Sequence, residues 1–231
     1  MFYGHRSHVP KVAGAAAISA ETIHVRYPGA DEDTLHGIDV SIPVGSRCAL
    51  IGHNGSGKST LLKAAAGILP AHSGSLSIYG NPVGACHHRV AYLAQRSSID
   101  WHFPLTVRDL VMTGRYGHLG WFARPRSKDN EMVDEVLERV QLAEFANRQI
   151  DELSGGQQQR ALLGRALTQN ADMLLLDEPM NALDHESQSI FHQIFMSLHE
   201  EGRTLVVATH DLDCIQEQFD VVLSMTKGRM E

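Results

Sequence analysis

Cysteine is scarce in this chain of 231 residues, which contains only Cys48, Cys86 and Cys214. An odd count without C-x-x-C spacing excludes a disulfide framework and favours a reducing compartment. Long apolar runs are also missing, because no stretch approaches the roughly 18 residues that a membrane-spanning helix needs. Basic residues are outnumbered, and the formal net charge of −7 argues against a protein that coats nucleic acid. We therefore expect a cytosolic globular protein.

The composition is otherwise ordinary for a soluble protein, with 43% hydrophobic and 20% charged residues. This length suits one large domain with an ample core. Residues 18–27 and 37–42 alternate apolar with polar side chains, which predicts half-buried antiparallel strands. Residues 73–80 show the same alternation. Residues 1–17 are expected to form an N-terminal tail that leads into the first strand.

The middle of the chain is predicted to be helical. Residues 106–115 begin with a capping box, in which Thr106 and Asp109 each bond to the other's backbone. Residues 130–142 place their apolar side chains on one helical face. The region 96–165 is therefore expected to be a helical insert.

Short apolar runs on either side of the insert predict a buried sheet. Residues 173–179 and 204–210 are nearly continuous apolar stretches, typical of parallel strands covered on both faces. The remaining expected elements are strands at 47–51 and 221–225 and helices at 60–69 and 185–200.

The stretch GHNGSGKST matches the phosphate-loop pattern G-x-x-x-x-G-K-[ST] in full, between an expected strand and an expected helix. Glycines let successive backbone N–H groups surround phosphate oxygens. Lys58 would reach the β- and γ-phosphates, and the Ser59 hydroxyl would ligate Mg²⁺. An ordinary glycine-rich turn is the weaker alternative. The predicted nucleotide-binding residues are Gly52, His53, Asn54, Gly55, Ser56, Gly57, Lys58, Ser59 and Thr60.

The stretch MLLLDEP supplies two carboxylates where a buried strand is expected to end. Asp177 is placed to hold Mg²⁺ through water. Glu178 follows directly, and a carboxylate beside the γ-phosphate would orient and deprotonate the attacking water. Two solvated acids at a strand end are the plain alternative, which the phosphate loop upstream argues against.

A second anion-binding segment is present in LSGGQQQR, Leu153–Arg160. Ser154 is predicted to cap a helix, and Gln157 to reach back to the cap. Gly155 and Gly156 allow another molecule to approach the backbone closely. The unpaired N–H groups of such a helix start attract anions.

Phosphate loop, LSGGQ and a D-E-P strand end, in this order, resemble the ATP-binding-cassette (ABC) ATPases over about residues 18–225. Further positions match the family. Tyr27 matches its adenine-stacking aromatic, and Gln95 matches the glutamine that contacts Mg²⁺ and links to the membrane subunit. Asn181–Asp184 match the loop that touches the opposite subunit, and His210 matches the histidine that bonds the γ-phosphate.

Three of these positions also have plainer explanations. The plainer role for Tyr27 is packing in a turn, which is weaker than the stacking role. Gln95 taken alone would be a surface glutamine, and His210 would be a capped histidine at the end of a buried strand.

The resemblance implies an α/β P-loop fold with a mixed RecA-like sheet core, an antiparallel β sub-domain and a helical sub-domain. Residues 18–231 would form the single ABC ATPase domain. Within it, 18–95 and 166–231 would make the core with the β sub-domain, and 96–165 the helical sub-domain. The implied cofactors are ATP and Mg²⁺.

The resemblance also implies a head-to-tail homodimer. Each copy would hold ATP on its own phosphate loop, and the second copy would close over the γ-phosphate. The closing residues would be Ser154, Gly155, Gly156 and Gln157, with Asp184 at the contact between copies. Closure then depends on the γ-phosphate and is lost on hydrolysis.

Within the family, the insert resembles the ATPases of bacterial manganese, zinc and ferrous-iron importers. Their pattern is Q-R-S, then D-W-x-F-P, then G-R-Y, and this chain has it at Gln95–Ser97, Asp100–Pro104 and Gly114–Tyr116. Trp101 and Phe103 suit either a groove for an apolar partner helix or the insert's own core. Met180 before NALD departs from the metal group, which more often has a threonine-rich loop there.

The resemblance to importers implies integral membrane permease subunits and an extracytoplasmic substrate-binding protein as partners, with no nucleic acid. The chain would sit peripherally on the cytoplasmic face of the cell membrane. Importers or multi-subunit exporters of another cargo remain alternatives, as does a non-transport ABC ATPase such as a repair head. A small-molecule kinase with the same phosphate loop is countered by LSGGQ.

Overall fold

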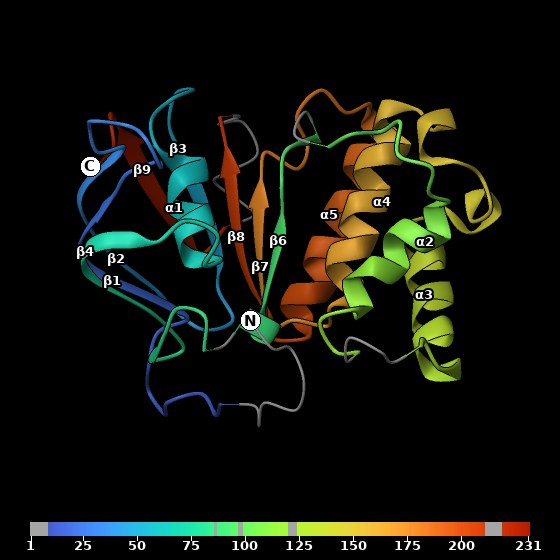
Figure 1. Ribbon diagram of the computed structural model, residues 1–231, viewed down its shortest axis with the longest axis horizontal. Coiled ribbons are helices and arrows are strands. Elements are labelled where there is room, and N and C mark those ends of the chain that lie inside the picture. Colours follow the sequence, from blue (N-terminus) through green and yellow to red (C-terminus); the bar gives the residue numbers. More distant parts are fainter. Residues whose placement is uncertain (1–8, 86, 97–98, 120–123, 211–218) are drawn as a thin grey trace.

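Two sheets of different kinds form the frame of the protein, with helices between and beside them (Figure 1). The structure is a computed structural model, and Cys86, Ser97 and Cys214 lie outside the residues that it describes. The described residues are 9–85, 87–96, 99–119, 124–210 and 219–231.

The smaller sheet has four strands in the order β2-β1-β4-β5, and its pairs are antiparallel. Its predicted strands are confirmed within two residues at each end. Alternate side chains of β1, such as Ile18 and Ala20, are buried beneath it. The strands are β1 (Ile18–Val25), β2 (Leu35–Ile42), β4 (Ala71–Ile78) and β5 (Asn81–Pro82).

The larger sheet has six strands in the order β10-β9-β3-β8-β7-β6, parallel except for β10. Along β7, Met173 and Leu175 join one buried cluster, while Leu174 and Leu176 join the other. This confirms the predicted parallel sheet covered on both faces. The strands are β3 (Arg47–Ile51), β6 (Val90–Leu93), β7 (Met173–Asp177), β8 (Thr204–Thr209), β9 (Val221–Thr226) and β10 (Arg229–Met230).

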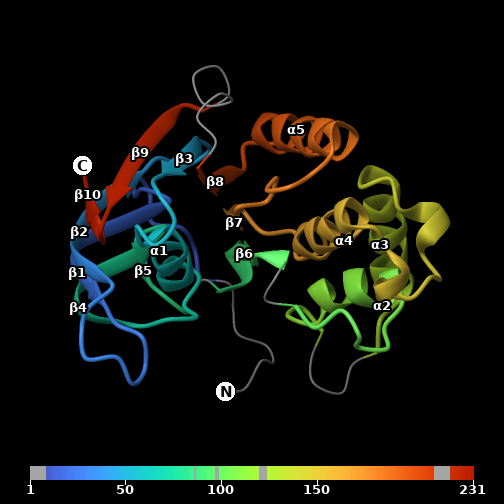
Figure 2. The same cartoon turned by 90° about the horizontal axis from the view of Figure 1, so that it is seen from above.

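Helices cover both faces of the larger sheet (Figure 2). Helix α1 (Lys58–Ala65) lies between the two sheets and contacts β1, β4 and β7. Helices α4 (Gly155–Thr168) and α5 (His185–Glu200) cover the opposite face, where α4 contacts β6 and α5 contacts β8. The larger sheet is therefore a layer between α1 on one face and α4 and α5 on the other.

The middle of the chain contributes α2 (Val107–Met112) and α3 (Ser127–Arg139), which pack on α4. The predicted capping box is formed at α2, where the Asp109 N–H donates to Thr106 Oγ1 at 3.1 Å and the Thr106 N–H donates to Asp109 Oδ2 at 3.2 Å. Helix α3 begins three residues before the expected 130–142. Short 3₁₀ turns are η1 (His87–Arg89), η3 (Thr113–Arg115), η4 (Ala143–Phe145) and η5 (Ile150–Glu152).

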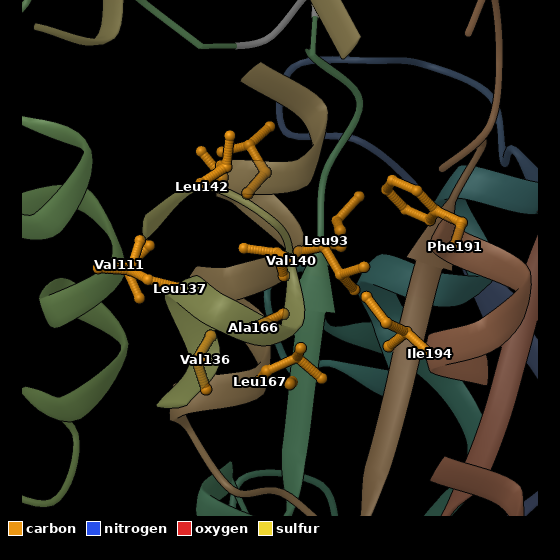
Figure 3. Packing of buried hydrophobic residues seen from close by; sticks show 14 of the residues in the cluster. Leu93, Val111, Val136, Leu137, Val140, Leu142, Ala166, Leu167, Phe191 and Ile194 are labelled. Atoms are coloured by element: carbon orange, nitrogen blue, oxygen red, sulfur yellow. The ribbon is translucent and has the colours of Figure 1, made fainter. Parts of the chain in front are cut away.

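One apolar cluster joins these helices to the sheet (Figure 3). Val111, Val140 and Leu167 come from the helical side, Leu93 from β6 and Phe191 from α5. The expected end of the helical sub-domain, residue 165, falls inside α4, so the division at that point stays a prediction. In the described part of the chain, no helix combines the length and apolarity that crossing a membrane requires.

Candidate functional site

The phosphate loop joins the end of β3 to the start of α1, as the sequence predicts. Gly57 caps α1 with φ of 107°, a left-handed conformation that L side chains rarely adopt. At Gly52, a Cβ would lie 2.3 Å from the Met225 carbonyl oxygen. Both glycines are therefore required by the backbone path, independently of any nucleotide.

Lys58 is folded back over this loop. Its Nζ donates to the Gly52 carbonyl at 2.6 Å and to the His53 carbonyl at 3.2 Å. Burial lowers the pKa of the Lys58 ammonium, although the carboxylates of Glu178 and Asp177 act in the opposite direction. The backbone carbonyls hold the ammonium beside the loop, where a phosphate would offer it a charged acceptor.

A cleft of about 450 Å³ opens beside the loop. It brings together three predicted residues that are far apart in the sequence: Tyr27, Gln95 and Glu178. Tyr27 packs against the buried cluster beneath, its hydroxyl 3.3 Å from Thr60 Oγ1 and its ring 5.6 Å from Lys63 Nζ. The other lining residues are Thr34, Asn54, Gly55, Ser56, Gly57, Lys58, Ser59 and Thr60.

Asp177 ends β7 directly beneath the start of α1. Its Oδ1 accepts from the Ser59 hydroxyl at 2.9 Å and its Oδ2 from the Tyr92 hydroxyl at 3.1 Å. Burial raises the pKa of the Asp177 carboxyl, opposed by those two hydrogen bonds. Hydroxyl and carboxylate oxygens are the hard donors that Mg²⁺ prefers, so this pair fits a magnesium ion.

Glu178 follows in a strained backbone conformation, with φ of 49°. Its N–H donates to the Ala208 carbonyl at 3.0 Å, which fixes the turn against β8. The side chain is 12% exposed, with Oε2 accepting from Asn181 Nδ2 at 3.2 Å and Oε1 lying 3.7 Å from His210 Nδ1. The structure therefore gathers Glu178, Asn181 and His210 at one edge of the larger sheet.

The LSGGQ segment forms the start of α4, and the predicted capping box is present. The Ser154 N–H donates to Gln157 Oε1 at 2.9 Å, and the Gln157 N–H donates to Ser154 Oγ at 3.3 Å. This segment is not part of the lining that the described residues give to the cleft. At Gly156, a Cβ would lie 2.5 Å from Ser187 Oγ and 3.3 Å from Asp184 Oδ2.

Asp184 caps α5 and so links the two helix starts. Its Oδ1 accepts from the Ser187 N–H at 2.7 Å, and this backbone hydrogen bond lowers the pKa of the Asp184 carboxyl. The starts of α4 and α5 lie side by side, because Gly156 leaves no side chain between them.

The aromatic residues of the insert differ in how far they are buried. Trp101 packs against the buried cluster of the helices, and its Nε1 donates to the Arg96 carbonyl at 3.2 Å. Phe103 is 57% exposed and Tyr116 is 55% exposed. Gly114 packs against α4, since a Cβ there would lie 2.2 Å from the Arg165 carbonyl oxygen.

Comparison with known proteins decides the family. A model described as the ABC transporter family matches residues 35–181 of this chain. This chain belongs to the ABC transporter family. It is an ATP-hydrolysing subunit of that family, and the expected ABC resemblance and α/β cassette fold are confirmed.

Curated relatives of this ABC ATPase include ATP-binding proteins of metal transport systems. The zinc transport system ATP-binding protein TroB of Treponema pallidum is 44% identical over 211 residues, which cover 91% of this chain and 79% of the relative. The manganese transport system ATP-binding protein MntB of Bacillus subtilis is 42% identical over 189 residues, which cover 82% and 76%.

Solved ABC cassettes share the fold. A dimeric bacterial ABC transporter cassette superposes with a TM-score of 0.80 at 26% identity, covering 93% of this chain and 96% of that one. CbiO1 of Clostridium perfringens, part of the transporter complex cbiONQ, superposes with a TM-score of 0.79 at 26% identity, covering 94% and 87%.

Thr34 lines the cleft and the Tyr92 hydroxyl bonds Asp177, and neither residue is predicted from the sequence. Tyr92 lies on β6, and the alternation in Val90–Leu93 is too short to predict a strand reliably against its surroundings. Once β6 is placed next to β7, the Tyr92 hydroxyl falls beside Asp177.

Proposed function

We propose that this ABC ATPase powers the uptake of a divalent transition metal, manganese, zinc or iron, across the cell membrane. The observation that carries the proposal is the similarity over most of the chain to manganese and zinc transport ATP-binding proteins, at 42% and 44% identity. Integral permease subunits and an extracytoplasmic substrate-binding protein would complete the system. The chain would bind the permease from the cytoplasmic face.

The cleft beside the phosphate loop is proposed to hold ATP. The adenine would stack on Tyr27, and the N–H groups of Gly52–Thr60 would receive the phosphates. Ser59, Gln95 and Asp177 are proposed to hold Mg²⁺, which would neutralise charge on the β- and γ-phosphates. Tyr92, through its 3.1 Å bond to Asp177, would keep that carboxylate in place.

Glu178 is proposed as the base of hydrolysis. A water oxygen would attack the γ-phosphorus while the bond to the β-phosphate oxygen breaks, and the water proton would pass to Glu178. Asn181 holds Oε2 of the carboxylate at 3.2 Å. His210 is proposed to donate to the γ-phosphate.

Two copies are proposed to complete each site. The start of α4 is outside this chain's own cleft, so Ser154, Gly155, Gly156 and Gln157 are free to cover ATP held by a second copy. The dimeric cassette that shares this fold supports such a pairing. Hydrolysis would then require the dimer, while a single copy would only bind ATP.

The exposed face of the insert is proposed to receive the permease. Phe103, 57% exposed, offers an apolar ring on this face, whereas Trp101 packs inward and supports the segment from below. Replacing a buried aromatic anchor by alanine costs about 2 kcal/mol or more of binding. Phe103→Ala should therefore loosen the hold on the permease while leaving ATP affinity of the free chain unchanged.

The control for this test is Ile68→Ala, because Ile68 is a similarly exposed apolar residue at 58% on a different surface. Co-purification of each variant with the permease measures the binding. If equal amounts of the permease co-purify with the Phe103 and Ile68 variants, the proposed contact between Phe103 and the permease is wrong.

The cargo is tested in cells that lack this chain. They should grow normally in rich medium and fail when manganese, zinc and iron are depleted. Adding back one metal in excess should restore growth and so identify the cargo. Unchanged initial uptake rates of all three ions in the deletion cells would contradict metal uptake, without affecting the ATPase assignment.

A further inference from the structure

The guanidinium of Arg96 lies against Gly155, the first residue of α4. A Cβ on Gly155 would lie 2.0 Å from Arg96 Nη1 and 3.2 Å from Cζ, so the arginine comes this close only because residue 155 has no side chain. Arg96 directly follows Gln95, which lines the chain's own cleft. One short segment thus connects the nucleotide cleft to the LSGGQ helix.

The backbone of Arg96 is hydrogen-bonded, but its guanidinium has no acceptor among the residues that the structure describes. The Arg96 carbonyl accepts from Trp101 Nε1 and from the Ile99 N–H, both at 3.2 Å. Over the described residues, no hydrogen bond or ion pair is made by the guanidinium, and the residue is exposed. Its five N–H donors remain available to a ligand.

The position of this charge is unfavourable without a ligand. A guanidinium is permanently charged, and the start of a helix carries partial positive charge, so a cation there is repelled. Asp184 also lies at this helix start, with its Oδ2 3.3 Å from the position of a Cβ on Gly156, but its Oδ1 already accepts the Ser187 N–H. An anion that binds between Arg96 and α4 would be attracted both by the guanidinium and by the start of the helix. A phosphate suits this position because its oxygens can accept two hydrogen bonds from the forked guanidinium.

We propose that Arg96 is a further nucleotide-binding residue and that it acts in trans, donating to the γ-phosphate of ATP held in the cleft of the second copy. This rests on the composite site of the proposed function. In that site, the role of Ser154, Gly155 and Gly156 follows from the resemblance to the family. The role of Arg96 is inferred from its position in this structure. Gln95 then serves one ATP and Arg96 the other, so neighbouring residues contact both nucleotides of the dimer.

The first test compares Arg96→Gln with Arg124→Gln, an exposed arginine of the insert, both in a Glu178→Gln background that slows hydrolysis. Calorimetry measures ATP binding to the single copy, and sedimentation measures the ATP-induced dimer. Arg96→Gln should leave monomer affinity within about twofold and weaken dimerisation at least about tenfold, since hydrogen bonds to charged groups contribute that much. Arg96→Lys should recover part of the loss.

A weakened monomer affinity with normal dimerisation would overturn the role in trans. So would an Arg96→Gln variant that dimerises like the Arg124 control. Thermal unfolding of each variant checks that the fold is intact. Replacing an exposed side chain that has no partner in the described part of the chain should shift the midpoint little.

The second test mixes differently tagged chains, again in the Glu178→Gln background, and counts ATP retained per heterodimer. Arg96→Gln is paired with Lys58→Ala. A role in trans places both lesions in one site, so about one ATP per heterodimer should remain. A role in the chain's own cleft damages both sites, and retention should fall towards none.

A reference mixture of Ser154→Arg with Lys58→Ala separates this inference from the proposed composite site. If the reference retains ATP and the Arg96 mixture does not, the role of Arg96 is wrong and the composite site stands. If neither mixture retains ATP, the composite site itself is contradicted, and the inference falls with it.

Discussion

The Ser59 hydroxyl donates to the Asp177 carboxylate at 2.9 Å across 118 residues of sequence. Ser59 belongs to the first turn of α1, and Asp177 is the last residue of β7. The fold therefore brings together, without a metal, the hydroxyl and carboxylate oxygens that are proposed to hold Mg²⁺. Preorganisation of this kind would lower the cost of ordering the two side chains on binding of MgATP.

Asp177→Asn should weaken binding of MgATP much more than binding of ATP in the presence of a chelator. The amide keeps the volume of the side chain and removes the negative charge that favours the metal. Calorimetry with and without Mg²⁺ measures the difference. Equal losses in both titrations would show that Asp177 acts on the fold rather than through magnesium.

Glu178→Gln should retain ATP affinity while hydrolysis slows by about a hundredfold or more, because the amide cannot accept the water proton. Asn181→Ala is the companion variant, since it removes the 3.2 Å contact to Oε2 and leaves the carboxylate. It should slow turnover less than Glu178→Gln. Steady-state phosphate release measures both, and a Glu178→Gln variant near wild-type turnover would exclude this residue as the base.

Asp220→Asn should reduce stability in a pH-dependent way. Hydrogen bonds from Arg47, chiefly from its side chain, hold the pKa of Asp220 at about 2, below its unfolded value of about 3.9. The folded chain resists protonation there, so the contribution is complete above about pH 4 and disappears as pH falls through about 2. With a 38% exposed carboxylate, solvent screening limits the loss at pH 7 to about 0.5–1 kcal/mol.

Urea unfolding at several pH values measures this effect, with Asp100→Asn as the control because its carboxylate is 77% exposed. The control should match wild type throughout. A deficit in Asp220→Asn that stays constant between pH 7 and pH 3 would show that packing, and not the charge pair with Arg47, is responsible.

Gly114→Ala should destabilise the fold by about 1–3 kcal/mol, as overpacking of a tight contact does. The added Cβ would lie 2.2 Å from both the Arg165 carbonyl oxygen and Thr168 Oγ1 on α4. Gly117→Ala is the matched control three residues on, with nothing within 4 Å of its Cβ position. Denaturant midpoints measure both, and similar values for the two variants would contradict the close packing.

Sequence patterns predicted the parts of the fold that depend on local chemistry. The phosphate loop needs left-handed glycines next to a strand, and capping boxes at Thr106 and Ser154 need partners three residues on, so each is readable within a few positions. Asp177 and Glu178 follow a buried strand in the same way. These features require no knowledge of distant segments.

Contacts between residues far apart in the chain could not be predicted from the sequence patterns. Tyr92 reaches Asp177 only because β6 pairs with β7, and Arg96 reaches Gly155 only because α4 lies beside the end of β6. The choice between inward and outward aromatics at Trp101 and Phe103 likewise depends on tertiary packing, which residue type alone leaves open.

The proposed nucleotide site shared between two copies is tested most directly by crosslinking between them. Within the phosphate loop, Asn54 is exposed and Ser56 is buried, so Asn54 is the better position for a cysteine. The pair to use is Asn54→Cys and Ser154→Cys, in a chain whose native cysteines are replaced by serine. One cysteine is placed on each of two differently tagged chains, also carrying Glu178→Gln. A crosslink between the two tagged chains is expected with ATP and Mg²⁺, and none with ADP. A crosslink that forms equally without ATP, or no crosslink under any nucleotide condition, would contradict the proposed shared site.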